Sequence, residues 1–235
     1  FFFFFKQKTA YEIMSSDLSS DVCSSDLELN EDYSIVFSWK TAGSDKLLAK
    51  KATALEQLKT PKTKVISLGA ILGPTRIAQY DDGIAFLRTA AEAGIDYVIP
   101  AAEEFMFGVN TLRSYAEFDF LPQFISANIV DEKTREPLMQ PYFVWNVSGR
   151  KICIVGLSDP EIIMDSDDDS VAGIDVIPFD EALTTIAGDL IRLNPDVMII
   201  AGRIDRDSLV DLALRRPYID AFIDRKSTRL NSSHY

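Results

Sequence analysis

Residues 93–112 read AGIDYVIPAAEEFMFGVNTL, and residues 124–160 read FISANIVDEKTREPLMQPYFVWNVSGRKICIVGLSDP. Short apolar runs at 96–101 and 123–129 predict two strands. The spacing of apolar residues at 109–116 predicts a helix between them. Two strands joined through a helix are typical of a sheet that contains parallel strands.

A hairpin follows this helical connection. Residues 142–147 and 151–157 flank Ser148-Gly149-Arg150, and a short turn that contains glycine is typical of two antiparallel strands. Outside the quoted stretch, apolar runs predict further strands, and apolar residues at helical spacing predict further helices. The expected strands lie at 34–39, 64–68, 196–201 and 220–223, and the expected helices lie after Ser44 and at 81–93, 180–193 and 207–215. The sequence therefore predicts one mixed α/β domain.

The quoted stretch closely resembles the 5′-nucleotidase branch of the calcineurin-like metallophosphatases. That family has an apolar strand followed by GNHEFDYG, a helix, a SANI strand, an EPL…PY segment and a hairpin that ends in IGVIGL, and their order is kept here. The resemblance implies an α/β/β/α sandwich with mixed sheets, truncated in this chain. It also implies two divalent metals, a C-terminal nucleotide-binding domain beyond this chain, and export to the periplasm or cell surface.

The resemblance also shows where the metal ligands should stand. Asp, His and Asn side chains at successive strand ends hold the two metals in the family, and two adjacent cations clamp a phosphoryl group and supply hydroxide. The family has Asp-x-His after its first strand, Gly-Asp after its second, Gly-Asn-His-Glu after its third, and Ser-His after a later strand. The residues that stand at these family positions are Lys40, Ala42, Ala70, Ala102, Glu103 and Arg203.

None of these residues is the one that the family uses. Alanine offers no electron-pair donor, and Lys40 and Arg203 would place fixed positive charge where two dications should bind. We therefore expect no catalytic residue and no bound metal, and a pseudoenzyme that serves as a binding or structural module. The same two cations suggest an anion site for a phosphate-containing small molecule, with solvated or carboxylate-paired side chains as the simpler interpretation.

An active hydrolase with a rearranged site is the alternative. Glu103 and Glu104, together with Asp81 or Asp82, would form a carboxylate-only site for Mg²⁺ or Mn²⁺. Against this, Asp81 and Asp82 stand where carboxylates favour the start of a helix. Glu103 would also have to point into the pocket, which the sequence does not show.

The two ends of the sequence have a different predicted origin. Residues 19–27 and 224–231 can be written as translations of opposite strands of one oligonucleotide, and both resemble translated sequencing-adapter sequence. We therefore expect residues 1–27 and 224–235 to be adapter-derived artefacts. Residues 28–223 are expected to be an incomplete metallophosphatase-like domain.

Excluding these ends changes the composition that matters. The excluded segments contain five basic and five acidic residues, so the net charge stays at −12, and they contain the only histidine, His234. This large negative charge argues against nucleic-acid binding. No apolar run approaches the ~20 residues of a membrane span. Cys153 is left as a lone cysteine in an apolar run, where a buried thiol is expected. Protein partners are not indicated.

Overall fold

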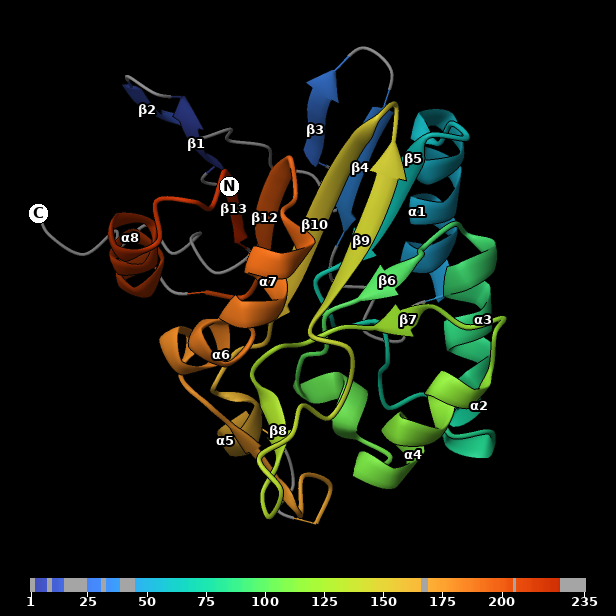
Figure 1. Cartoon of the computed structure of the whole chain (residues 1–235). Coiled ribbons are helices and arrows are strands. Elements are labelled where there is room, and N and C mark those ends of the chain that lie inside the picture. Colours follow the sequence, from blue (N-terminus) through green and yellow to red (C-terminus); the bar gives the residue numbers. More distant parts are fainter. Residues whose placement is uncertain are drawn as a thin grey trace, which may run out of the picture.

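The computed structural model describes residues 3–7, 10–14, 25–30, 33–38, 45–165, 169–204 and 206–224. Two main sheets lie between two groups of helices (Figure 1). The predicted α/β/β/α sandwich with mixed sheets is confirmed. Among the described residues, no helix is both long and apolar enough to cross a membrane.

The first sheet has the strand order β3-β4-β5-β6-β7. Strands β4 to β7 are parallel to one another, and β3 runs antiparallel to β4 at the edge. The bounds are Ser25–Asn30 for β3, Tyr33–Ser38 for β4, Thr63–Ser67 for β5, Tyr97–Val98 for β6 and Gln123–Phe124 for β7.

The second sheet has the order β2-β1-β13-β12-β10-β9. Strands β10, β12 and β13 are parallel, and β9 and β1 pair antiparallel with β10 and β13 respectively. The bounds are Phe3–Gln7 for β1, Ala10–Met14 for β2, Tyr142–Val147 for β9, Arg150–Leu157 for β10, Val197–Gly202 for β12 and Ala221–Asp224 for β13. A separate antiparallel pair contains β8 (Ile129–Asp131) and β11 (Ile174–Val176).

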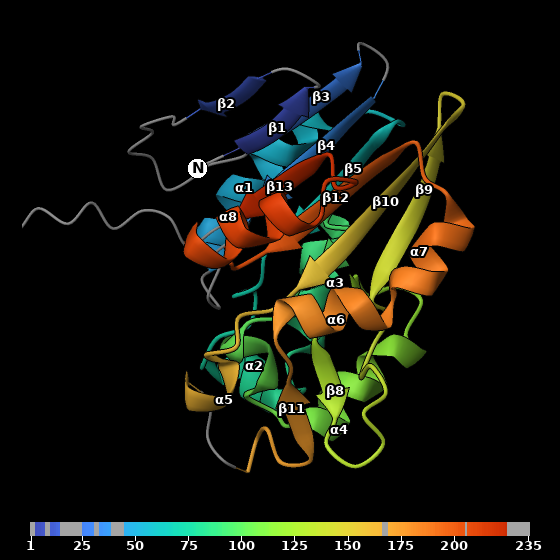
Figure 2. The same cartoon turned by 60° about the vertical axis from the view of Figure 1, so that its left-hand side comes forward.

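Helices cover the outer face of each sheet (Figure 2). The first sheet is covered by α1 and α3, with α2, α4 and the two 3₁₀ helices below them, and the second is covered by α6, α7 and α8. The bounds are Asp45–Leu58 for α1, Arg76–Tyr80 for α2, Ile84–Glu92 for α3, Ala102–Phe105 for η1, Val109–Ser114 for α4, Tyr115–Glu117 for η2, Ile162–Asp165 for α5, Phe179–Thr185 for α6, Ala187–Leu193 for α7 and Arg206–Arg215 for α8.

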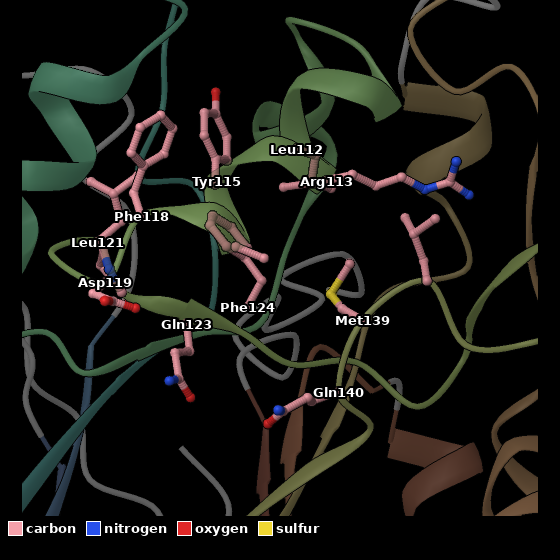
Figure 3. A pocket seen from close by; sticks show the side chains of 13 residues that line it. Leu112, Arg113, Tyr115, Phe118, Asp119, Leu121, Gln123, Phe124, Met139 and Gln140 are labelled. Carbon is pink, nitrogen blue, oxygen red and sulfur yellow. The ribbon is translucent and has the colours of Figure 1, made fainter.

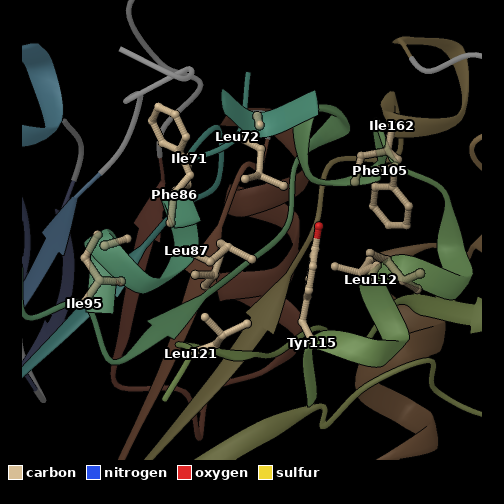
Figure 4. Packing of buried hydrophobic residues seen from close by; sticks show 14 of the residues in the cluster. Ile71, Leu72, Phe86, Leu87, Ile95, Phe105, Leu112, Tyr115, Leu121 and Ile162 are labelled. Carbon is tan, nitrogen blue, oxygen red and sulfur yellow. The ribbon is translucent and has the colours of Figure 1, made fainter. Parts of the chain in front are cut away.

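The strands alternate between two apolar layers because their side chains point to opposite faces. In β4, Ile35 and Phe37 pack between the sheets, whereas Val36 packs toward α1 and α3. Figure 4 shows part of this outer layer, in which Leu87 of α3 lies near Leu121. Cys153 of β10 faces the opposite helices and is buried, as predicted, and burial raises the pKa of its thiol to about 12.

The structure differs from the sequence expectations in the extent of several elements. Strands β6 and β7 are only two residues long, and the predicted strand at 123–129 continues instead as the separate strand β8. The helix expected at 180–193 divides into α6 and α7 at Ile186, and α2 was not expected. The hairpin turn is confirmed, and both Ser148 and Gly149 have positive φ, as a two-residue turn of type I′ requires.

The predicted boundaries at residues 27 and 224 stay predictions. Strands β1 and β2 fall within 1–27, and β1 pairs with β13 in the described structure. Asp224 ends β13 and is buried.

Candidate functional site

Buried polar side chains gather where the parallel strands of both sheets end. In an α/β sheet, ligands bind beyond the carboxyl ends of the strands, so this is the candidate site. We call it the strand-end site. Its buried polar side chains, each at most 4% exposed, are Ser38, Ser67, Glu104, Ser126, Asn128, Ser158, Asp159 and Asp224.

The loop after β5 has a constrained backbone. Gly69 has a φ of +80°, and a Cβ atom there would lie 2.7 Å from the Cβ atom of Ala101, so only glycine fits. Ala70 is fully buried and has a φ of +56°, a left-handed conformation that costs a non-glycine residue about 1–2 kcal/mol. Ala70 is the residue expected from the sequence to replace the family's metal-bridging Asp, and its methyl group offers no ligand atom.

The carboxylate of Glu104 joins this loop to the one after β6. Its Oε2 atom accepts the backbone N–H groups of Ala70 and Ala101 at 3.0 and 2.9 Å. Its Oε1 atom accepts those of Ile71 and Leu72 at 2.7 and 3.2 Å. Burial raises the pKa of Glu104, and the backbone hydrogen bonds oppose that shift. All four donors are main-chain groups, so the carboxylate is engaged within the fold.

The other carboxylates of the alternative metal site are not assembled with Glu104. Asp81 accepts the N–H of Ala85 at 2.8 Å and so stabilises the start of α3, as the sequence favoured. Tyr115 donates its hydroxyl proton to the backbone carbonyl of Asp82. Glu103 and Ala102 lie half-buried in η1. Within the described ranges, no group of three or more His, Cys, Asp or Glu residues is placed to hold a metal ion.

Arg203, at the end of β12, pairs with carboxylates that follow β10. Its Nε atom lies 2.9 Å from Oδ2 of Asp159, and its Nη2 atom lies 3.9 Å from Oε2 of Glu161. Asp159 is 3% exposed, and the short contact with Arg203 is a charge contact rather than an aligned hydrogen bond. The sequence left open whether Arg203 is solvated or paired with a carboxylate, and the structure places it beside Asp159 and Glu161. Lys40 and Ala42 lie outside the described residues.

Gly202 lets β12 approach β10 closely. A Cβ atom at Gly202 would lie 1.9 Å from the carbonyl oxygen of Leu157, a distance that no side chain can occupy. Beside it, the N–H of Ile204 donates to the Asp224 carboxylate at 2.9 Å. Glycine at position 202, which was expected from the sequence to align with the family's Ser, is therefore a packing requirement in this chain.

A neutral network connects the two sheets at the same level. Ser126 and Asn128 follow β7, and Ser158 follows β10. The Asn128 side chain donates to the carbonyl of Ser158 at 2.8 Å and accepts its N–H at 2.8 Å, while the hydroxyl groups of Ser126 and Ser158 lie 3.0 Å apart. All three side chains are fully buried. The network holds the sheets together and leaves these polar groups satisfied.

Sequence reasoning missed three features of this site: the Glu104 hydrogen bonds, the Asp159–Arg203 pair and the Ser126–Asn128–Ser158 network. One signal was available for each carboxylate. Glu104 is the residue of the GNHE motif that this chain retains, and Asp159 is an acidic residue directly after a long apolar strand. Their partners come from other loops, which spacing along the chain cannot identify.

Known proteins with the same fold were found by comparison of structures. A calcineurin-like phosphoesterase from Bacillus subtilis superimposes with a TM-score of 0.68 and 18% identity over 82% of this chain and 71% of that one. A 5′-nucleotidase precursor from Thermus thermophilus gives a TM-score of 0.61 and 16% identity over 76% of this chain and 38% of that one. The fold is that of the calcineurin-like metallophosphatases.

The resemblance to the 5′-nucleotidase branch is also confirmed in sequence. A curated 5′-nucleotidase from Vibrio cholerae is 24% identical over 168 residues, which are 68% of this chain and 30% of that protein. The chain therefore spans less than a third of that relative's length. No family model matches the chain.

The described side chains do not fit the two-metal centre that this resemblance implies. Such a centre needs carboxylate, amide and imidazole ligands from several strand ends. Here Ala70 and Ala102 offer no donor, Glu104 is bound by main-chain N–H groups, and Asp159 is paired with Arg203.

Proposed function

We propose that this chain is a non-catalytic metallophosphatase-like domain, which acts as a binding or structural module. The observation that supports the proposal is that the buried carboxyl groups of Glu104 and Asp159 at the strand ends are both engaged by groups of this chain. Four backbone N–H groups engage Glu104, and the guanidinium of Arg203 engages Asp159. Both carboxyl groups therefore stabilise the fold itself.

The energetic argument concerns Arg203. A dication that bound Asp159 would first have to break the ion pair, which would leave a guanidinium beside a double charge. At ~4 Å and an effective dielectric constant of 20, that repulsion is about 8 kcal/mol. Two alanines replace ligands that could offset the repulsion.

A metal and activity measurement on the 235-residue chain tests the proposal. The chain would be incubated with Mn²⁺, separated from free metal and examined by elemental analysis, and its hydrolysis of p-nitrophenyl phosphate would be followed. We expect no tightly held transition metal and no rate above that of Mn²⁺ alone. Two tightly held metals per chain would contradict the proposal, as would hydrolysis that Glu103→Ala abolishes. The second result would favour the carboxylate-based hydrolase.

Binding of a phosphate-containing small molecule by Lys40 and Arg203 stays a prediction. The pairing of Arg203 with Asp159 and Glu161 competes with an incoming anion for the same guanidinium. Calorimetry with inorganic phosphate at millimolar concentration checks this prediction. Saturable heat that Lys40→Ala removes would support the site, and no heat would contradict it. Location in the periplasm or at the cell surface likewise stays a prediction.

A further inference from the structure

A pocket of about 330 Å³ lies at the open edge of the first sheet, between η2, the edge strand β7 and residues 138–140 (Figure 3). We call it the edge pocket. None of its lining residues belongs to the strand-end site. Its volume is at the lower end of the range for small-molecule sites, which suits a compound of one or two rings.

Apolar and polar groups contribute about equally to the walls of the edge pocket, and three of the lining residues are aromatic: Tyr115, Phe118 and Phe124. Phe118 and Phe124 are half-buried, so each ring keeps part of its surface toward solvent. Aliphatic side chains from α4, from the loop before β7 and from 138–140 complete the walls: Leu112, Leu121, Leu138 and Met139. A flat apolar ring suits such a space because aromatic side chains stack on it or meet its edge.

The charges around the pocket favour a cation. Arg113 extends away from the other labelled side chains in Figure 3, and its guanidinium donates to Asp131 at 2.9 Å, so its charge is balanced. Asp119 is exposed, and no ion pair engages it among the described residues. The exposed carboxamides of Gln123 and Gln140 add neutral hydrogen-bonding groups. The remaining charge at the mouth is therefore negative.

Two further effects act in the same direction. The faces of Phe118 and Phe124 carry the negative side of the ring quadrupole, which attracts cations within about 6 Å of the ring centre. The net charge of −12 raises the local concentration of small cations around the whole molecule. Neither effect favours an anionic ligand such as a phosphate ester.

We propose that the edge pocket binds a small aromatic amine, with its ring between Phe118, Phe124 and the aliphatic wall and its ammonium group toward Asp119. The site is independent of the strand-end site, so its test does not depend on the presence or absence of hydrolysis. Tryptamine is a suitable probe because it combines a two-ring body with one ammonium group. Indole-3-acetate has the same ring with the opposite charge.

The test is a calorimetric titration of the 235-residue chain with each probe. We expect saturable binding of tryptamine and binding of indole-3-acetate that is at least 10-fold weaker. Asp119→Asn should weaken tryptamine binding about 2- to 5-fold, as expected for an exposed ion pair. Glu117→Gln is the matched control, since it removes one exposed charge from η2 outside the pocket lining, and it should leave binding unchanged.

A second pair of variants tests the place of binding. Ala116 is exposed and lines the pocket, so Ala116→Trp should block it without overpacking the core, and Glu117→Trp adds the same bulk beside it. We expect loss of binding only in Ala116→Trp, with thermal unfolding of both variants unchanged. The proposal is overturned if tryptamine shows no saturation at 10 mM, if Ala116→Trp binds it normally, or if indole-3-acetate binds equally well.

Discussion

The two halves of the strand-end site each contain a buried carboxylate, but they satisfy it with different groups. In the first half, formed by residues 69–72 and 101–104, main-chain N–H groups surround Glu104. In the second half, formed by residues 157–159 and 202–204, the Oδ2 atom of Asp159 faces the Arg203 side chain, while its Oδ1 atom accepts the main-chain N–H of Glu161 at 3.0 Å. Both carboxylates are buried, with exposed fractions of 1% and 3%.

This difference determines how each half responds to substitution. Main-chain donors are present whatever side chains stand at 70, 71, 72 and 101, so the first half depends on the backbone path and on Glu104 alone. A side-chain donor can be lost in one substitution, and the second half therefore depends on Arg203. It also depends on the close approach of β10 and β12.

The largest effect is expected from Gly202→Ala, which attacks the backbone contact of the second half. The new Cβ would have to occupy space 1.9 Å from the Leu157 carbonyl oxygen, so β10 and β12 would separate. We expect a loss of more than about 4 kcal/mol in the free energy of unfolding, measured by urea denaturation. Gly188→Ala is the control, because Gly188 lies in α7 with open space around it, and it should be neutral or slightly stabilising.

Removal of the Glu104 carboxylate should be the next most severe change. Glu104→Ala leaves four buried N–H groups without their acceptor and creates a cavity. We expect a loss of about 3–5 kcal/mol, measured in the same denaturation experiment. Glu103→Ala, at the half-buried neighbouring position, should cost less than 1 kcal/mol. Equal effects at the two positions would show that the four hydrogen bonds contribute little.

Arg203→Met tests the side-chain pairing of the second half. The change leaves Asp159 buried without its cation, and we expect a loss of about 2–4 kcal/mol. Adding Asp159→Asn should recover part of that loss, because the uncompensated charge is removed. Unfolding measurements on both single variants and the double variant give the coupling energy. A coupling near zero would mean that the pair does not hold the second half together.

A smaller effect depends on pH. It distinguishes what the charge of Glu104 contributes to stability from what its hydrogen-bonding oxygen atoms contribute. Burial raises the pKa of Glu104, so the folded state holds its proton more firmly than the unfolded state does. Its contribution to stability is therefore complete below the unfolded pKa of ~4.5 and falls as pH rises through the folded pKa. Between about pH 4 and pH 7, wild type should lose stability relative to Glu104→Gln. A constant difference would contradict the raised pKa.

The smallest effect is expected from Ala70→Gly in the first half. Glycine relieves the left-handed conformation at φ +56°, but it also loses a buried methyl group and gains entropy in the unfolded state. The net change should lie within about 1 kcal/mol of zero, with thermal unfolding as the measurement. A clearly larger loss would show that the Ala70 methyl group, rather than the backbone path, supports the loop after β5.

Several elements could be predicted from local sequence because their own residues determine them. The apolar run of Ile35, Val36 and Phe37 specified a strand, which the structure buries on both faces, and Ser148-Gly149 specified the turn of the hairpin. The lengths of β6 and β7 could not be predicted, because pairing with a neighbouring strand decides where a strand ends. The division between α6 and α7 at Ile186 could not be predicted either, because the helical spacing of apolar residues continues through it.

The same distinction between local sequence and tertiary pairing applies to the candidate site. The sequence by itself determined which residue types stand at the strand ends, and from them came the prediction that alanine and arginine replace the family's metal ligands. Only the tertiary structure decided what the remaining carboxylates do, because their partners come from segments far apart in the chain. Glu104 meets a loop 34 residues before it, and Asp159 meets an arginine on a different strand. Hydrogen bonds and ion pairs act over a few ångströms in space, and the folded sheets alone bring those groups within reach.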